Sequence, residues 1–154
     1  MRWPLLLVCA LFAGCHASPP PPPTTADLHF PVVVLFGNTS AASYANASAL
    51  GNMSIGQLNA VIGPPPLIDS QFAIYRLAKL SSTHNGLWLM ANPTGNTPVT
   101  FTLERDPKSG IEATRTLFLQ RLEGQTWRTD LDQRRRALAT EQTITGMLAL
   151  VQGD

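Results

Sequence analysis

The sequence predicts an α+β fold, in which an antiparallel meander of about five to six strands follows a short capped helix and packs one face against a C-terminal helix. Three observations lead to this class. Residues 28–36 are mainly apolar and rich in Val and Phe, residues 72–129 alternate apolar runs with short turns, and residues 131–152 repeat apolar side chains at helical spacing. Residues 27–154 are expected to form a single domain that can bury its own core.

The first strand is expected at residues 28–36, which end at a Gly-Asn pair typical of a turn. Residues 39–50 form a run of Ala, Ser and Asn that fits either a short helix or an ordered loop. This part of the chain therefore predicts one strand, followed by a segment that is either helix or loop.

The capped helix has the clearest local signal. Ser54 stands directly before residues 55–62, and Gln57 lies three residues further on, so the two can form a capping box. Gly63 is expected to end the helix in the left-handed conformation, and the prolines at residues 64–66 prevent its continuation. Two turns are too few for an isolated helix, so it must pack on an apolar surface.

Beyond this helix the apolar period changes from helical to alternating. Turn sequences rich in Gly, Pro and Asn separate the apolar runs, which predicts antiparallel strands with short connections. The cleanest alternation places Val99, Phe101 and Leu103 on one face. The expected strands are residues 72–77, 87–90, 99–105, 111–122 and 125–129.

The C-terminal helix is expected at residues 131–152, with Asp130 as its N-cap. Gly146 weakens the helical pattern. The alternative prediction for residues 143–151 is therefore a final strand.

Three consecutive arginines lie within this helix, and on a helix they point around most of its circumference. Such a run is usually a solvated face. A contact for anionic lipid headgroups or for an acidic partner is the functional alternative. The three are Arg134, Arg135 and Arg136.

Residues 1–14 are expected to be a signal peptide. Arg2 precedes an apolar run at residues 5–12, which is far shorter than the ~20 residues that a membrane-spanning helix requires. Small residues then lead to Cys15. An ordinary secretory signal with an incidental cysteine is the alternative interpretation.

Residues 15–26 are expected to be a linker. The unbroken proline run at residues 19–23 favours an extended polyproline II rod, which rises ~3.1 Å per residue and would hold the domain away from a membrane. A ligand for a proline-recognising groove is the alternative, but the segment lacks the basic residues that usually orient such peptides.

The pentapeptide Leu-Phe-Ala-Gly-Cys at residues 11–15 resembles the lipobox of bacterial lipoproteins. The resemblance implies that Cys15 becomes the N-terminus and carries acyl chains such as palmitate, which anchor the chain in a membrane. His16 stands where enterobacterial lipoproteins of the inner membrane carry an aspartate. By this resemblance we expect an outer-membrane lipoprotein whose domain faces the periplasm.

Charge and cysteine content exclude several function classes. The formal net charge of +1 falls to zero when Arg2 leaves with the signal, so no basic surface for nucleic acid is expected. Cys9 also leaves with the signal and the lipid consumes Cys15, so the mature chain has no thiol for a disulfide, a metal or a nucleophile. Charged side chains are sparse between residues 27 and 103.

An enzyme is not expected. The domain contains only His29 and His84 as candidate bases, and it carries no Gly-x-Ser-x-Gly, His-Glu-x-x-His or phosphate-loop motif. Asp27 beside His29 is an alternative metal pair, although a position at the linker junction explains both residues. We therefore expect no catalytic residue, no metal and no cofactor.

A longer pattern gives a family resemblance. Residues 53–65 read Met-Ser-x-x-Gln-Leu-x-x-x-Ile-Gly-Pro-Pro, and a later strand reads Val-Thr-Phe-Thr-Leu before a glycine turn. Over residues 50–116 this pattern resembles the SmpA/BamE outer-membrane lipoproteins. The resemblance implies a role beside the machinery that assembles β-barrels, and related folds include secreted inhibitors of hydrolases. Residues 28–36, 117–129 and the terminal helix have no counterpart in the short members.

Three functions follow as hypotheses. The favoured one is an accessory or scaffold of an outer-membrane complex, such as a barrel-assembly, pilus or secretion apparatus. An inhibitor or immunity protein against a periplasmic hydrolase would insert residues 81–86 or 92–96, and a carrier of an apolar ligand would line its cavity with Trp88, Phe101, Phe118 and Trp127. The expected contacts with an envelope protein partner are Arg134, Arg135, Arg136, His84, Asn85 and Trp88.

Overall fold

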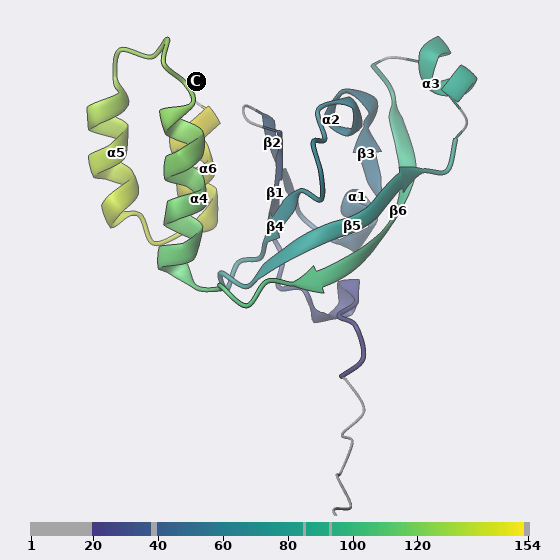
Figure 1. Ribbon diagram of the computed structural model, residues 1–154, viewed down its shortest axis with the longest axis horizontal. Coiled ribbons are helices and arrows are strands. Elements are labelled where there is room, and N and C mark those ends of the chain that lie inside the picture. Colours follow the sequence, from purple (N-terminus) through teal and green to yellow (C-terminus); the bar gives the residue numbers. More distant parts are fainter. Residues whose placement is uncertain (1–19, 38–39, 85, 93, 153–154) are drawn as a thin grey trace, which may run out of the picture.

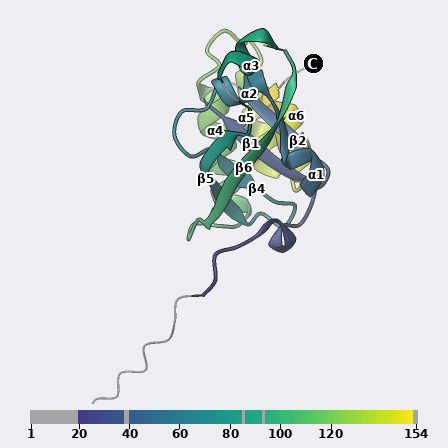
Figure 2. The same ribbon diagram turned by 90° about the vertical axis from the view of Figure 1, so that its right-hand side faces the viewer.

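The computed structural model describes residues 20–37, 40–84, 86–92 and 94–152, and the proposed lipidation site Cys15 lies outside these ranges. Six antiparallel strands form one sheet that curls into a half-barrel, and the C-terminal helices pack against it (Figures 1 and 2). The strands are β1 (Val32–Phe36), β2 (Ser40–Tyr44), β3 (Asn52–Ser54), β4 (Pro66–Ile68), β5 (Ile74–Ser82) and β6 (Asn96–Arg105). The helices are the 3-10 helix η1 (Thr25–Asp27) and α1 (Ala47–Leu50), α2 (Ile55–Asn59), α3 (Gly86–Ala91), α4 (Ile111–Glu123), α5 (Leu131–Thr140) and α6 (Ile144–Gln152).

The strands lie in the order β2-β1-β4-β5-β6-β3. β1 and β2 form a hairpin, and β4, β5 and β6 form a meander that joins this hairpin through β1. β3 pairs with the start of β6 at the other end of the sheet. The predicted α+β class, with an antiparallel sheet, a preceding capped helix and C-terminal helical packing, is confirmed.

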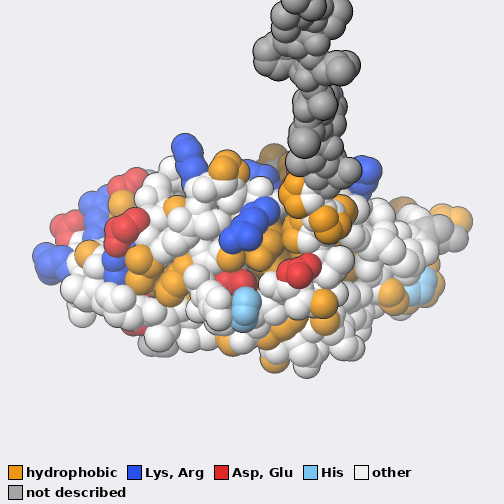
Figure 3. Space-filling model, turned by 90° about the horizontal axis from the view of Figure 1, so that it is seen from below, with side chains coloured by type: hydrophobic (Ala, Val, Ile, Leu, Met, Phe, Trp, Pro, Cys, Tyr) orange, Lys and Arg blue, Asp and Glu red, His pale blue; other side chains and the backbone are white. Residues whose placement is uncertain are grey.

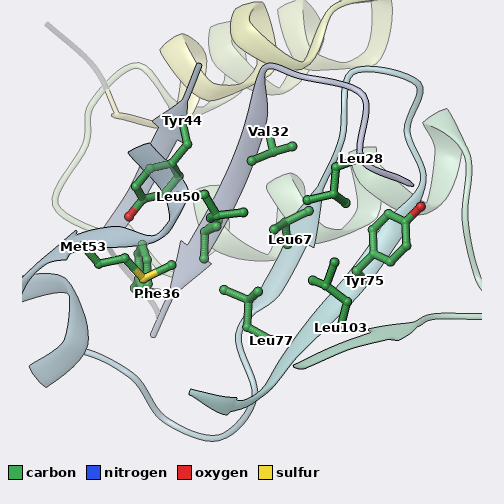
Figure 4. Packing of buried hydrophobic residues seen from close by; sticks show 11 residues of the cluster. Leu28, Val32, Phe36, Tyr44, Leu50, Met53, Leu67, Tyr75, Leu77 and Leu103 are labelled. Carbon is green, nitrogen blue, oxygen red and sulfur yellow. The ribbon is translucent and has the colours of Figure 1, made fainter. Parts of the chain in front are cut away.

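β1 is buried on both faces, which explains its continuous apolar sequence. Val32, Val34 and Phe36 belong to the core of the concave face, and Val33 and Leu35 belong to the core under the helices. Figure 4 shows the concave core, which consists of Leu28, Val32, Val34, Phe36, Tyr44, Leu50, Met53, Leu67, Tyr75, Leu77 and Leu103.

The capping box of α2 is present as predicted. The Ser54 hydroxyl accepts a hydrogen bond from the Gln57 N–H at 3.2 Å, and Gln57 Oε1 accepts one from the Ser54 N–H at 3.0 Å. Gly63 adopts a φ of 71°, as expected for a left-handed residue. The α-helix itself ends at Asn59, earlier than the predicted end, and Ile62 is 82% exposed.

Three of the predicted strands are wrong. Residues 87–90 lie in helix α3, residues 111–122 lie in helix α4, and residues 125–129 contain no strand. A short apolar run such as 87–90 has no period that separates strand from helix. In α4, the buried Thr114, Phe118 and Leu122 are spaced four apart, which is the helical period.

The C-terminal helix is divided in two. α5 ends at Thr140 and α6 begins at Ile144, so the alternative of a final strand at residues 143–151 is excluded. Asp130 precedes α5, but its carboxylate pairs with Arg134 and makes no capping hydrogen bond. β2, β3 and β4 were not predicted, because β2 consists mainly of Ala and Ser, which carry no strand signal, and the other two strands are three residues long.

Candidate functional site

The most distinctive surface feature is the tip of a two-stranded arm. β5 and β6 extend beyond the short strand β4, and α3 joins them at the far end, where β3 pairs with the first residues of β6 (Figure 1). Leu87 and Met90 of α3 are 79% and 80% exposed, and no residue of α3 is buried. We name Leu87, Met90, His84 and Trp88 the tip surface.

A network of side chains holds the base of the tip surface. His84 Nδ1 lies 2.8 Å from the hydroxyl of Thr97, which lies 2.7 Å from the hydroxyl of Ser82. The His84 N–H donates to the same Ser82 oxygen at 3.0 Å. Thr97 is fully buried, so this network fixes the imidazole between the two strands of the arm.

The arm is also tied to the preceding elements. Met53 of β3 pairs with Thr97 of β6, and the Ile55 N–H donates to the Gly95 carbonyl at 3.0 Å. A bulge between Ala78 and Ser81 interrupts the pairing of β5 with β6. The capped helix α2 therefore sits against the chain that leaves α3.

Charged side chains are concentrated away from the tip surface. Figure 3 shows most Lys, Arg, Asp and Glu side chains over the helical end and the middle of the molecule, and none at the end that carries α3. The sequence agrees, because no charged residue occurs between Lys79 and Glu104. The tip surface thus combines apolar side chains with one imidazole and contains no Lys, Arg, Asp or Glu, and depletion of charge is typical of the centre of a protein interface.

The structure separates the predicted contact residues into two groups. His84 and Trp88 lie together on the tip surface, and Asn85 between them lies outside the described residues. The three arginines belong to α5, at the opposite end of the molecule (Figure 1). One surface containing all of these residues does not form.

The arginine run does not form a free basic patch either. Arg134 pairs with Asp130 and donates to the Leu150 carbonyl at 2.8 Å, which ties α5 to α6. Arg135 lies 3.2 Å from Asp132 and 3.5 Å from Glu123. Arg136 is exposed. Two of the three cations therefore have intramolecular partners.

Asp27 and His29, the alternative metal pair, have different hydrogen-bond partners. Asp27 accepts hydrogen bonds from the N–H and hydroxyl of Thr24, at 2.7 and 2.9 Å, and these bonds lower the pKa of its carboxyl. His29 Nδ1 lies instead 3.4 Å from the buried carboxylate of Asp69. Among the described residues no three His, Cys, Asp or Glu side chains gather as a metal site.

The Asp69 carboxylate stabilises a turn through hydrogen bonds to the backbone. Its Oδ1 accepts the N–H groups of Gln71 and Ala73, at 3.0 and 2.9 Å, so it closes the turn between β4 and β5. A cavity of about 610 Å³ borders Asp69, His29 and residues 20–24. Among the residues that the structure describes, the His29 imidazole is paired with Asp69 and with no side-chain hydroxyl.

The four aromatic residues expected to line a ligand cavity are dispersed. Trp88 is on α3, Phe101 packs against the concave core, Phe118 is buried in the core under the helices, and Trp127 is 65% exposed. The predicted lining of an apolar carrier is therefore wrong.

Sequence reasoning missed two features of the surface. Leu87 and Met90 were assigned to a strand, although the absence of charge around them could have indicated an exposed contact. The burial of Arg121 also has no local signal in the sequence, and its guanidinium donates to the carbonyls of Phe36 and Ser40.

Comparison with protein-family models, with curated proteins and with solved structures finds no match for the chain. In the described part of the chain, no helix has the length and apolar character needed to cross a bilayer.

Proposed function

We propose that this chain is a lipid-anchored, non-catalytic lipoprotein of the bacterial outer membrane, and that it acts in the periplasm as an accessory of an outer-membrane protein complex. The observation that carries this proposal is the exposed apolar pair Leu87 and Met90 at the end of the β5–β6 arm. Large exposed apolar side chains that lie together indicate a site of protein contact.

The position of the tip surface agrees with an anchor at Cys15. Residues 20–27 leave the domain on the side opposite to α3 in both ribbon views (Figures 1 and 2). Acyl chains at Cys15 would therefore hold the domain with α3 directed away from the lipid and toward proteins in the periplasm. The SmpA/BamE resemblance supports a barrel-assembly complex as one such partner.

Photocrosslinking in intact cells tests this role. A photoreactive p-benzoylphenylalanine at position 90 is expected to give an adduct with an envelope protein. The same group at Gln133, which is exposed on α5 at the other end of the molecule, is the matched control and should give none. Equal adducts from both positions, or none from positions 87 and 90, would contradict a contact through the tip surface.

Lipidation is tested separately. The wild-type chain is expected to incorporate labelled palmitate and to fractionate with membranes, and Cys15→Ser should lose both properties. If the Cys15→Ser chain still carried palmitate, the proposed anchor would be wrong even if the tip surface bound a partner.

The protruding α3 also favours a second candidate function, the inhibition of a periplasmic hydrolase. Residues 81–84 and 94–96 border α3, so the arm could insert this helix into a cleft. A purified one-to-one complex that blocks the activity of the crosslinked partner would favour the inhibitor. A larger assembly that keeps its activity would favour the accessory.

A further inference from the structure

The outer edge of β6 is open along its second half. β3 pairs with β6 only as far as Pro98, and the N–H of Val99 then donates to the Gly51 carbonyl at 3.0 Å. Beyond Val99, at residues 100–105, no backbone group of the described chain pairs with this edge. The half-barrel therefore ends in an unpaired strand edge, which is a template for a further strand.

Val99 establishes which residues point outward. In an antiparallel strand, the backbone groups of every second residue face the same edge. Phe101, Leu103 and Arg105 therefore direct their N–H and C=O groups outward, like Val99. Asp106 belongs to the alternate set of residues, whose backbone groups face β5, and its N–H donates to the Ile74 carbonyl at 2.8 Å.

A hollow lies beside this edge. Phe101, Thr102 and Leu103 border a cavity of about 320 Å³, and residues 22–25 border its other side. The edge is consequently next to open space, with the segment that precedes β1 beyond it.

The side chains at the edge favour an apolar partner strand. Phe101 is half-buried against the concave core, and Leu103 is buried in it. In an added strand, the residues opposite these two would also face the concave side. Apolar side chains at alternate positions would cover Phe101 and extend the core.

We propose that β6 binds an extended segment of a partner protein by strand addition, in line with β3, through the backbone groups of Phe101, Leu103 and Arg105. Main-chain hydrogen bonds would supply the affinity, and alternate apolar side chains would supply the preference. A single strand suits this place better than a second copy of the chain, because residues 22–25 border the same hollow and limit the width beside the edge. This binding depends neither on the acyl anchor nor on the tip surface.

Amide hydrogen exchange by NMR tests the proposal on the ¹⁵N-labelled chain from residue 15 onward, with Cys15→Ser. The probe is the capped peptide Thr-Val-Thr-Val-Thr-Val-Thr. We expect new protection at the outward amides of Phe101, Leu103 and Arg105, and no change at Thr102, which already faces β5. The control peptide carries N-methylated Val residues, which would lie opposite Phe101 and cannot donate, and it should not bind.

A pair of variants isolates one hydrogen bond. Phe101→Pro removes the outward N–H and leaves the pairing with β5 intact, because proline is tolerated where the N–H faces away from the sheet. Phe101→Ala removes the same side chain and keeps the N–H. We expect Phe101→Pro to bind the peptide about tenfold more weakly than Phe101→Ala.

Several outcomes would overturn strand addition. These are equal binding of the N-methylated peptide, protection at Thr102 or away from β6, and no binding at millimolar peptide. A dimer in light scattering that Phe101→Pro dissociates would assign the edge to a second copy instead. If Phe101→Pro did not fold, the wild-type chain would still test strand addition, because it should bind the unmethylated peptide and not the N-methylated one.

Discussion

The imidazole ring of His84 stacks on the indole ring of Trp88, with 3.8 Å between the ring centroids and 12° between the planes. His84 is also held by Thr97 and Ser82 at the end of the arm. The stack therefore connects α3, which has no buried residue, to the hydrogen-bonded pair β5 and β6.

Trp88→Ala is expected to loosen α3 without unfolding the domain. Loss of the stack removes about 0.5–1.5 kcal/mol from the local stability of α3, because no residue of this helix is buried. Amide exchange within α3 should become faster, while the midpoint of thermal unfolding stays within about 2 °C. Leu87→Ala, at a position 79% exposed, should change neither quantity. A large fall in the midpoint for Trp88→Ala would mean that α3 is part of the global core.

The parts of the fold that the sequence predicts are those with a local cause. The capping box of Ser54 and Gln57 and the left-handed Gly63 depend on residues that are close in sequence, and β1 is marked by its own continuous apolar run. The strand β3 depends on pairing with β6, more than 40 residues away, and its three residues carry no period of their own. Long-range pairing of this kind is invisible to a sequence window.

Arg121 is expected to be structurally required although it is a cation. Its guanidinium is buried, with Nη2 2.6 Å from the Phe36 carbonyl and also bonded to the Ser40 carbonyl. Arg121→Met should destabilise the domain by about 2 kcal/mol in denaturant unfolding, because both carbonyls lose their donor. Arg136→Met, the same change at an exposed position of α5, should have an effect below about 0.5 kcal/mol.

The charge of Arg121 itself works against folding. Burial lowers the pKa of its guanidinium to about 10, below the ordinary value for arginine, so the unfolded chain holds this proton more tightly than the folded chain. This cost to folding is complete below about pH 10 and fades as the pH rises from there toward the ordinary pKa of arginine. If Arg121→Met were as stable as the wild type at pH 7, the carbonyl bonds would contribute no more than this cost.

Gly37 and Gly63 are glycines for different reasons: both have a positive φ, but only Gly37 also lies too close to a neighbouring backbone atom for a side chain. Both have positive φ, at 51° and 71°, but a Cβ at Gly37 would lie 2.6 Å from the Ala60 carbonyl oxygen, whereas a Cβ at Gly63 would meet nothing within 4 Å. Gly63→Ala should lower the free energy of unfolding by about 1–2 kcal/mol, because alanine is strained at a positive φ. Gly37→Ala should cost clearly more in denaturant unfolding, because the chain after α2 must also move. Equal costs would mean that the contact with Ala60 relaxes freely.

The candidate site was harder to predict than the fold, for a physical reason. Exposure of Leu87 and Met90 follows from the reach of the β5–β6 arm, and the open edge of β6 follows from the short length of β3. Both are properties of the assembled sheet. His84 and Trp88 were predicted as contacts and do lie together, whereas the arginine run on α5 is largely occupied by intramolecular partners.

The break between α5 and α6 is stabilised by Glu141. Its Oε1 accepts the N–H groups of Gln142 and Thr143, at 2.9 and 2.8 Å, and the Thr143 hydroxyl, at 2.8 Å. These bonds lower the pKa of Glu141 below its ordinary value of 4.5. A depressed folded-state pKa contributes stability that is complete above pH 4.5 and is lost as the pH falls through the folded value. Glu141→Gln should therefore destabilise the domain at pH 7 and have little effect at strongly acid pH.

Gly146 in the first turn of α6 makes room for this carboxylate, since a Cβ there would lie 2.5 Å from Glu141 Oε2 and 2.6 Å from Oε1. Gly→Ala in a helix normally stabilises by about 0.5–1 kcal/mol. In the wild type, Gly146→Ala should instead destabilise, because it displaces the carboxylate from its three donors. In an Glu141→Ala background the same change should stabilise by the usual amount. Denaturant unfolding of the two single variants and the double variant gives the coupling between the sites. If Gly146→Ala had the same effect in both backgrounds, the glycine would serve α6 for a reason unrelated to Glu141.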